Sequence, residues 1–193
     1  MGMSFYSIST VKMEYAHQES ERLIYRRVTL DDVPAWADFF VDNDRLHFFD
    51  FDLKKSTEEL AEQWINVQLE RYNANGFGHL AVELKSTREL IAMGGILPRQ
   101  IKGQAEFEIG YSVNPRHWGN GYATEIAMTM KEFAIRHIDS ARFISIIDLE
   151  NSQSANVALK NGMRILFQTD FKGAPVNIYG IENTSQDLEI SSF

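Results

Sequence analysis

An arginine and two glycines form the chemically most informative pattern in this chain. They follow the spacing Arg-x-x-Gly-x-Gly, from Arg116 through Gly119 to Gly121. Residues 106–113 before them alternate like a strand, and residues 123–137 after them have the apolar periodicity of an amphipathic helix. Glycine lets backbone N–H groups converge, and the first N–H groups of a helix have no intrahelical acceptor, so a strand–turn–helix of this kind binds anions. The pattern predicts a phosphate site, although a plain strand-to-helix turn would need the same glycines.

The glycine spacing separates this turn from two other phosphate loops. It is neither the dinucleotide fingerprint G-x-G-x-x-G nor the P-loop G-x-x-x-x-G-K-[ST]. Residues 115–125 read Pro-Arg-His-Trp-Gly-Asn-Gly-Tyr-Ala-Thr-Glu. This stretch resembles the pyrophosphate loop, Arg/Gln-x-x-Gly-x-Gly/Ala, of the GNAT superfamily of acyl-CoA-dependent N-acyltransferases. The longer form is similar to the RimJ/RimL branch, which includes enzymes that acetylate ribosomal-protein N-termini.

The elements that must position this turn follow one continuous order. Strands are expected at residues 22–28, 77–84, 90–97, 105–113, 142–149, 163–171 and 176–182, the first of them at an edge. Helices are expected at residues 31–41, 56–75, 123–137 and 151–161. The order matches the GNAT fold, so the resemblance implies an α/β (α+β) protein: a mixed, mostly antiparallel sheet of about seven strands, flanked by four helices and splayed between strands 4 and 5. Residues 1–20 read as an N-terminal extension, 21–183 as one domain and 184–193 as a polar tail.

Local signals support several of these boundaries. Ser56-x-x-Glu59 has the spacing of a capping box, and either Asn151 or Ser152 can cap the helix that follows them. Gly162 suits the left-handed residue after the end of that helix. Gly110 inside a strand predicts a bulge or a close backbone approach.

Composition excludes several function classes. The 193 residues include no cysteine, which excludes disulfides, thiolate metal ligands and a cysteine nucleophile. The net charge of −8 disfavours nucleic acid as a partner. No secretory signal or membrane-span pattern is visible, so we expect a cytoplasmic protein without a membrane partner. No histidine has a partner at metal or triad spacing, so no metal is expected; His79 and most others read as structural or exposed, while His117 could contact the phosphate.

The resemblance also implies how acetyl-CoA is held. The loop residues expected at its pyrophosphate, mostly through the main chain, are Arg116, His117, Trp118, Gly119, Asn120, Gly121, Tyr122, Ala123 and Thr124. The pantetheine arm would lie in the splay, pairing with backbone groups of Tyr111, Ser112 and Val113, one of which would polarise the thioester carbonyl. Asn151, Ser154 and Lys160 belong to a stretch that is similar to the family's fourth helix. Ser154 would donate to the leaving thiolate, and Asn151 would hold the pantetheine or serve only as the cap.

A general base is needed because the acceptor amine must be neutral to attack. Glu106 and Glu108 alternate onto one strand face, and the family often has glutamate near the splay, so Glu108 is the first candidate and Glu106 the second. Asp148, at the end of the fifth strand, is a third. The alternation fits a solvated strand face or ion pairs equally well.

The acceptor segment is the least defined. Residues 45–52 link the first two helices, and the resemblance implies that they line the acceptor site, where Phe48, Phe49, Asp50 and Phe51 would suit an amine on an apolar body. The same aromatics could simply cover the sheet. The sequence therefore predicts an N-acetyltransferase acting by direct attack in a ternary complex, on a protein N-terminus or a small-molecule amine. A non-catalytic acyl-CoA sensor on the same fold is an alternative function. The sequence does not define the oligomeric state, for which a homodimer is one alternative.

Overall fold

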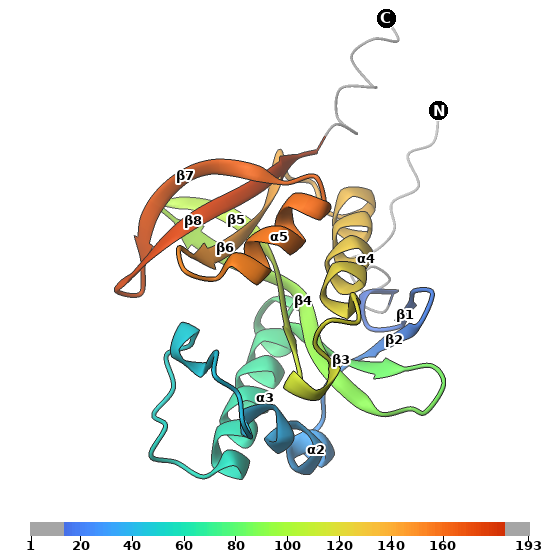
Figure 1. The fold of residues 1–193 in the computed structure, drawn as a ribbon. Helices are drawn as coiled ribbons and strands as arrows, with labels where there is room; N and C mark the ends of the chain where they lie inside the picture. The colour runs from blue at the N-terminus through green and yellow to red at the C-terminus, as the bar shows by residue number, and fades with distance from the viewer. Residues whose placement is uncertain (1–13, 184–193) are drawn as a thin grey trace, which may run out of the picture.

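The computed structural model describes residues 14–183, and within that range it forms one eight-stranded sheet (Figure 1). The strands are β1 (Gln18–Glu19), β2 (Leu23–Arg26), β3 (His79–Leu84), β4 (Leu90–Ile101), β5 (Gln104–Val113), β6 (Arg142–Asp148), β7 (Arg164–Phe171) and β8 (Ala174–Glu182). The helices are α2 (Val33–Ala37), α3 (Thr57–Asn75), α4 (Tyr122–His137) and α5 (Ser152–Lys160), with 3-10 turns η1 (Leu30–Asp32), η2 (Asp38–Phe40), η3 (Leu46–Phe48) and η4 (Pro115–His117).

The strand order is β1-β2-β3-β4-β5-β6-β8-β7, and every neighbouring pair is antiparallel except β5 and β6. The predicted mixed, mostly antiparallel sheet with four helices is confirmed. The sheet has one strand beyond the seven that were expected, because Gln18–Glu19, in the segment expected to be an N-terminal extension, pairs with β2. The strand expected at residues 22–28 therefore does not form the edge.

Helix ends follow the capping chemistry of the sequence. The Ser56 side chain accepts from the Glu59 N–H at 3.2 Å, and the Glu59 carboxylate accepts from the Ser56 N–H at 2.8 Å, so the predicted capping box begins α3. The Asn151 side chain accepts from the Ser154 N–H at 3.0 Å and caps α5. Gly162 follows α5 with a φ of 80°, the left-handed conformation expected there.

The first expected helix, at residues 31–41, was wrong in extent. Only Val33–Ala37 is α-helical, and η2 follows it directly. Side chains three residues apart eclipse in a 3-10 turn, and the Trp36 and Phe39 rings are stacked with centroids 4.6 Å apart. This tightening buries Trp36, Phe39 and Phe40 together, whereas Val41 is exposed in extended backbone.

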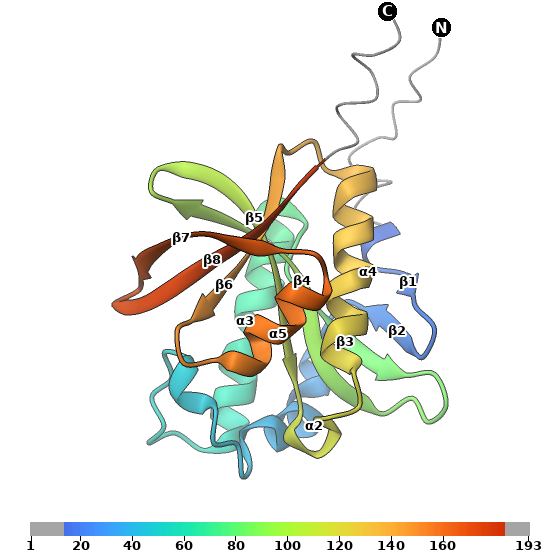
Figure 2. The ribbon, with the colours of Figure 1, turned by 45° about the horizontal axis from the view of Figure 1, so that its top comes forward.

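Two layers of helices enclose the sheet. Figure 2 shows α3 on one side of the strands and α4 and α5 on the other. The core runs through the sheet and joins both layers, with Trp36 and Trp64 on the α2–α3 side and Ile126 and Phe133 of α4 on the other. No helix within residues 14–183 is long and apolar enough to cross a membrane.

The segment before β1 belongs to the packed structure. Tyr15 is fully buried, its hydroxyl donates to the Gly78 carbonyl, and the Ile96 N–H donates to the hydroxyl at 2.7 Å. Residues 14–20 therefore join strands β3 and β4 through one buried phenol, which the polar character of residues 1–20 did not predict.

The parallel pair β5–β6 opens part way along its length. Its described pairing is a single register position, Glu108 with Ile144, and the Ser145 hydroxyl adds a bond of 2.8 Å to the Ile109 carbonyl. Beyond that point β5 continues against β4 alone, through Val113. The predicted splay between the fourth and fifth expected strands is therefore present. Gly110 lies at its start without a bulge in the β4–β5 register, and the group that approaches it closely is the His79 side chain rather than another backbone.

Candidate active site

The turn between β5 and α4 has the geometry of an anion site. Gly119 and Gly121 both have a φ of 79°, a left-handed conformation that other residues adopt at a cost. Gly121 is the N-cap of α4, and no atom lies within 4 Å of where a Gly119 side chain would begin. The Thr124 and Glu125 N–H groups donate to the Gly121 carbonyl at 3.1 Å, so the N–H groups before them, at the positive end of the helix dipole, are those without an intrahelical acceptor. The turn therefore presents a main-chain surface that fits a pyrophosphate.

The side chains of this turn are engaged with the protein. The Arg116 guanidinium donates to Asp38 at 2.8 Å, and a His117 ring nitrogen lies 3.0 Å from a Glu89 oxygen. The Asn120 amide donates to two carbonyls within the turn. These contacts leave the main chain of the turn as its free surface, and a phosphate contact by the His117 ring stays a prediction.

A cavity of ≈ 110 Å³ lies beside the turn, at the splay. On one side it is lined by Tyr111, Ser112 and Val113, on another by Asn151 and Ser154 of the α5 region. Trp118 and Ala123 of the turn complete this wall, and Phe39, Phe48 and Phe49 face it from the α2–α3 side. The predicted pantetheine residues and part of the predicted acceptor segment are thus brought around one space.

Tyr111 and Ser154 form a hydroxyl pair in that cavity. Their side-chain oxygens lie 3.0 Å apart, and the phenol also donates to the Ser154 carbonyl at 3.2 Å. Burial, opposed in part by the Ser154 hydrogen bond, raises the pKa of Tyr111 to about 12, so the phenol is neutral and able to donate. The sequence placed only the backbone of Tyr111 at the site. Its alternation with Ile109 and Val113 onto one face could have indicated the side chain.

The predicted bases are held in ion pairs. Glu106 is buried and bonded to both Nε and Nη2 of Arg142, at the paired end of β5 away from the splay. Glu108 is buried with one oxygen 2.5 Å from Arg99 Nε. The ion-pair alternative thus describes both side chains, and Glu106 is a structural anchor of the β5–β6 junction. Glu108 remains beside the splay with its second oxygen on the Gly110 side.

Asp148, the third candidate, begins the turn into α5. Its side chain accepts from the Glu150 N–H at 2.9 Å, which is an Asx turn. This role explains a short acidic residue at the end of β6 without general-base chemistry.

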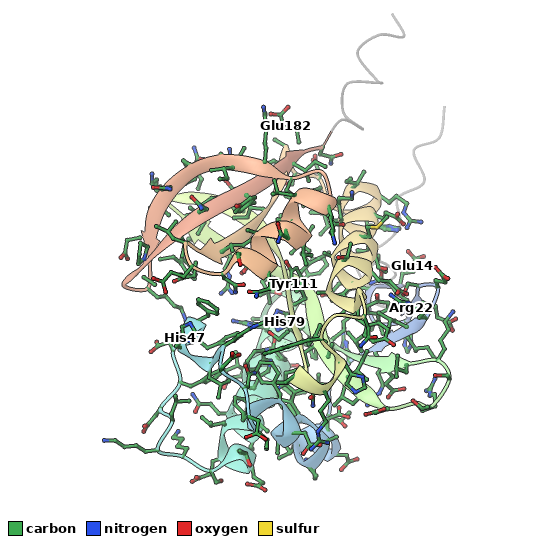
Figure 3. All side chains as sticks on the ribbon, in the orientation of Figure 1. Glu14, Arg22, His47, His79, Tyr111 and Glu182 are labelled. Atoms are coloured by element: carbon green, nitrogen blue, oxygen red, sulfur yellow. The ribbon has the colours of Figure 1, made fainter. Side chains whose placement is uncertain are left out.

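His79 is buried beside the splay, a position that the sequence did not indicate. It lies in β3 facing Gly110, and a side-chain carbon added at Gly110 would be 3.0 Å from His79 Nε2. Burial first, and then the charges of Arg71 and Arg99, lower the pKa of His79 to about 3. Neither ring nitrogen has a hydrogen-bond partner within residues 14–183. Figure 3 shows His79 and Tyr111 in the middle of the molecule, where the splay begins. Within the same residues no group of three or more histidine, aspartate or glutamate side chains is arranged to hold a metal ion.

The acceptor segment divides between the cavity and solvent. The Phe49 and Phe51 rings are stacked with their centroids 5.4 Å apart, and each centroid lies 5.5 Å from that of the Trp64 ring. Because the chain is extended here, Asp50 between them points outward; it is exposed and does not line the cavity. A contact of Asp50 with the amine therefore stays a prediction, and Phe51 packs against Phe49 rather than lining the cavity. Only Phe48 and Phe49 of the predicted set face it.

A wider hollow of ≈ 760 Å³ adjoins the outer side of the turn. Gly121 and Thr124 line it together with Lys160 at the end of α5, the residue predicted on resemblance alone. Arg22 also lines it and donates from Nη1 to the Asn120 carbonyl at 3.0 Å. Lys160 thus places a positive charge beside the predicted pyrophosphate turn, whereas Arg22 is paired with Glu125 at 2.7 Å and further glutamates line the same hollow.

Comparison with known proteins places these features in a family. The Acetyltransferase (GNAT) domain model matches residues 22–164. The uncharacterized protein YkkB of Bacillus subtilis is 32% identical over 126 residues, covering 65% of this chain and 71% of YkkB. The uncharacterized N-acetyltransferase YoaA of the same organism is 27% identical over 169 residues, covering 84% of this chain and 94% of YoaA.

The solved structures give the same fold. The ribosomal L7/L12 α-N-protein acetyltransferase RimL, in complex with coenzyme A, aligns with a TM-score of 0.68 at 17% identity, over 84% of this chain and 95% of RimL. The chain belongs to the GNAT acetyltransferase domain family and is an acetyl-CoA-dependent N-acetyltransferase.

Proposed function

We propose that this enzyme transfers the acetyl group of acetyl-CoA to a primary amine by direct attack in a ternary complex. The observation that carries this proposal is the cavity at the β5–β6 splay. It is bounded by the turn before α4, by Tyr111–Val113 and by Asn151 and Ser154, and it opens toward the aromatic α2–α3 segment. One space therefore adjoins both a phosphate-binding surface and an apolar acceptor wall.

The acetyl-CoA site follows from the groups around this space. The pyrophosphate lies on the main chain of residues 119–124, with Lys160 beside it. The pantetheine lies along the part of β5 that is not paired with β6. A backbone N–H of that part stabilises the charge that develops on the thioester oxygen. The absence of cysteine agrees with attack by the amine itself, since no thiol nucleophile is present.

Proton movement is shared between two sides of the splay. The amine nitrogen bonds to the carbonyl carbon and releases a proton, through water, toward Glu108 on the α3 side. The bond between that carbon and sulfur breaks, and Ser154 donates a hydrogen bond to the departing thiolate. Tyr111 keeps the Ser154 hydroxyl in place at 3.0 Å. A free thiol has a pKa of about 8.5, so the thiolate leaves readily near neutral pH and needs no strong acid.

The acceptor is a primary amine on a peptide or small molecule. RimL acts on a ribosomal-protein N-terminus by its name, and the RimJ/RimL-like loop makes a protein N-terminus one candidate here. The cavity is small and lined by Phe48 and Phe49, so the group next to the amine has to be compact or flat.

The test is release of CoA thiol from acetyl-CoA, followed with a thiol reagent across N-terminal peptides, amino acids, polyamines and aminoglycosides. The enzyme has no cysteine to react with the reagent. We expect release that depends on one class of amine and an acetylated amine as product. Binding of acetyl-CoA with no amine-dependent release would instead favour an acyl-CoA sensor, and failure to bind acetyl-CoA would refute the assignment of the turn.

A further inference from the structure

Arg45 is a charged residue at the cavity that the acetyl-transfer chemistry does not use. It precedes η3, and its guanidinium carbon lies 3.6 Å from the centroid of the Trp118 ring. The Trp118 indole N–H donates to the Val113 carbonyl at 2.7 Å, at the end of the splayed strand. Both Arg45 and Trp118 line the cavity. The guanidinium is therefore seated over a ring that is itself fixed beside the expected thioester.

The other end of Arg45 is fixed as well. Its backbone N–H donates to the Asn43 side chain at 3.0 Å, and the Asn43 amide donates to the Phe39 carbonyl at 2.9 Å. Asn43 is buried. A guanidinium held at its base by a buried amide and stacked at its tip on a ring loses little freedom when it binds a ligand.

This cation lacks a close carboxylate. Among the described residues its ionic contact is Asp44 at 3.9 Å, and that side chain is 85% exposed, so the attraction is weak. Arg45 is the charged residue among those that line the cavity, and Asp50 is turned to solvent. Stacking occupies the face of a guanidinium but leaves its N–H edge available for a planar anion.

We propose that the acceptor carries a carboxylate close to its amine, and that Arg45 binds this carboxylate and so sets acceptor specificity. The inference rests on the proposed acetyl transfer and names its substrate class: an amino acid, or a short peptide with its free carboxylate near the amine. The aromatic wall covers the apolar body of the acceptor while Arg45 holds its anionic group. A phosphate of CoA would offer the guanidinium the same chemistry, and the experiment separates the two.

The experiment compares acceptors in matched pairs. L-amino acids and dipeptides are offered as free acids and as the corresponding amides, and kcat/KM is measured for each with the wild type and with Arg45→Met. We expect the acid-to-amide ratio to fall roughly 10- to 100-fold in Arg45→Met, the range of a charge-assisted hydrogen bond. Arg45→Lys keeps the charge without the planar fork, so its ratio should lie between the two. The matched control is Arg27→Met, which removes an exposed arginine stacked 5.1 Å from the Tyr72 ring, away from the cavity.

Three outcomes overturn the inference in different ways. An unchanged acid-to-amide ratio in Arg45→Met, with kcat/KM reduced equally for both forms, would make Arg45 a support for Trp118. An unchanged ratio with weaker CoA binding, measured by calorimetry, would assign the guanidinium to a CoA phosphate. Turnover by the wild type of amides but not acids would exclude an acidic acceptor. Absence of thiol release with every amine would instead contradict the proposed function.

Discussion

Acid should destabilise this protein through His79 in particular. The pKa of its imidazole is lowered to about 3 in the folded state, by burial and by Arg71 and Arg99, and is about 6.5 in an unfolded chain. The unfolded state therefore takes up the proton first. The contribution of neutral His79 is complete above about pH 6.5 and is lost progressively as the pH falls toward the folded-state pKa.

The magnitude follows from the interval between the pH and the unfolded pKa. At pH 5 this interval is about 1.5 pH units, and each unit is worth about 1.36 kcal/mol. The free energy of unfolding is therefore about 2 kcal/mol lower at pH 5 than at pH 7.5. That is a large part of the ~5–15 kcal/mol by which domains are stable.

The assay is urea unfolding at pH 7.5 and at pH 5, with the wild type, His79→Leu and the control His17→Leu, which removes an exposed histidine. We expect the wild type and His17→Leu to lose about 2 kcal/mol more than His79→Leu between the two pH values. Equal losses in all three proteins would refute the reasoning, because His79 would then be protonated normally inside the fold.

Three further perturbations test the site and its support. Gly121→Glu should weaken CoA binding at least tenfold, as measured by calorimetry. The control Gly173→Glu places the same side chain at a positive φ of 83° in the β7–β8 turn and should leave CoA binding unchanged. Equal effects of the two substitutions would contradict the anion site. Ser154→Ala and Tyr111→Phe should each lower kcat about tenfold with CoA affinity kept within about twofold, and the double variant should be little worse than either single one because the hydroxyls act together; fully additive losses would separate their roles. Tyr15→Phe should lower the free energy of unfolding by about 1–3 kcal/mol in urea, since it leaves two buried backbone groups without a partner, and a loss well below that range would show that they are satisfied in another way.

The parts of the fold that the sequence predicted are those governed by neighbours along the chain. Three helix-end features depend only on residues within one turn: the capping box of Ser56 and Glu59, the cap by Asn151 and the left-handed Gly162. The residue types at these positions are therefore enough to predict them. The turn at Gly121 was predicted for the same reason, and all of these were confirmed.

The side chains of the site depend instead on residues far apart in the sequence. The partner of Glu106 is Arg142, which a helix and a crossover separate from it, and a guanidinium there cannot be read from strand alternation. Tyr111 meets Ser154 across the splay, 43 residues away. Arg45 lies over the Trp118 ring, 73 residues away in the sequence. Such contacts require the register and the packing, which local patterns do not contain.

Arg22 ties the beginning of the described chain to the turn before α4. It donates to the Asn120 carbonyl at 3.0 Å and, with the Ser20 hydroxyl, holds the Glu125 carboxylate in the first turn of that helix. Coupling between two sites is reciprocal, so whatever free energy the docked N-terminal strand gives to coenzyme binding, the bound coenzyme returns to the docking of that strand. On the proposed acetyl-CoA site, we therefore expect residues 14–22 to contribute to the affinity for the acyl donor, and we expect a fusion or a cut that displaces them to alter catalysis.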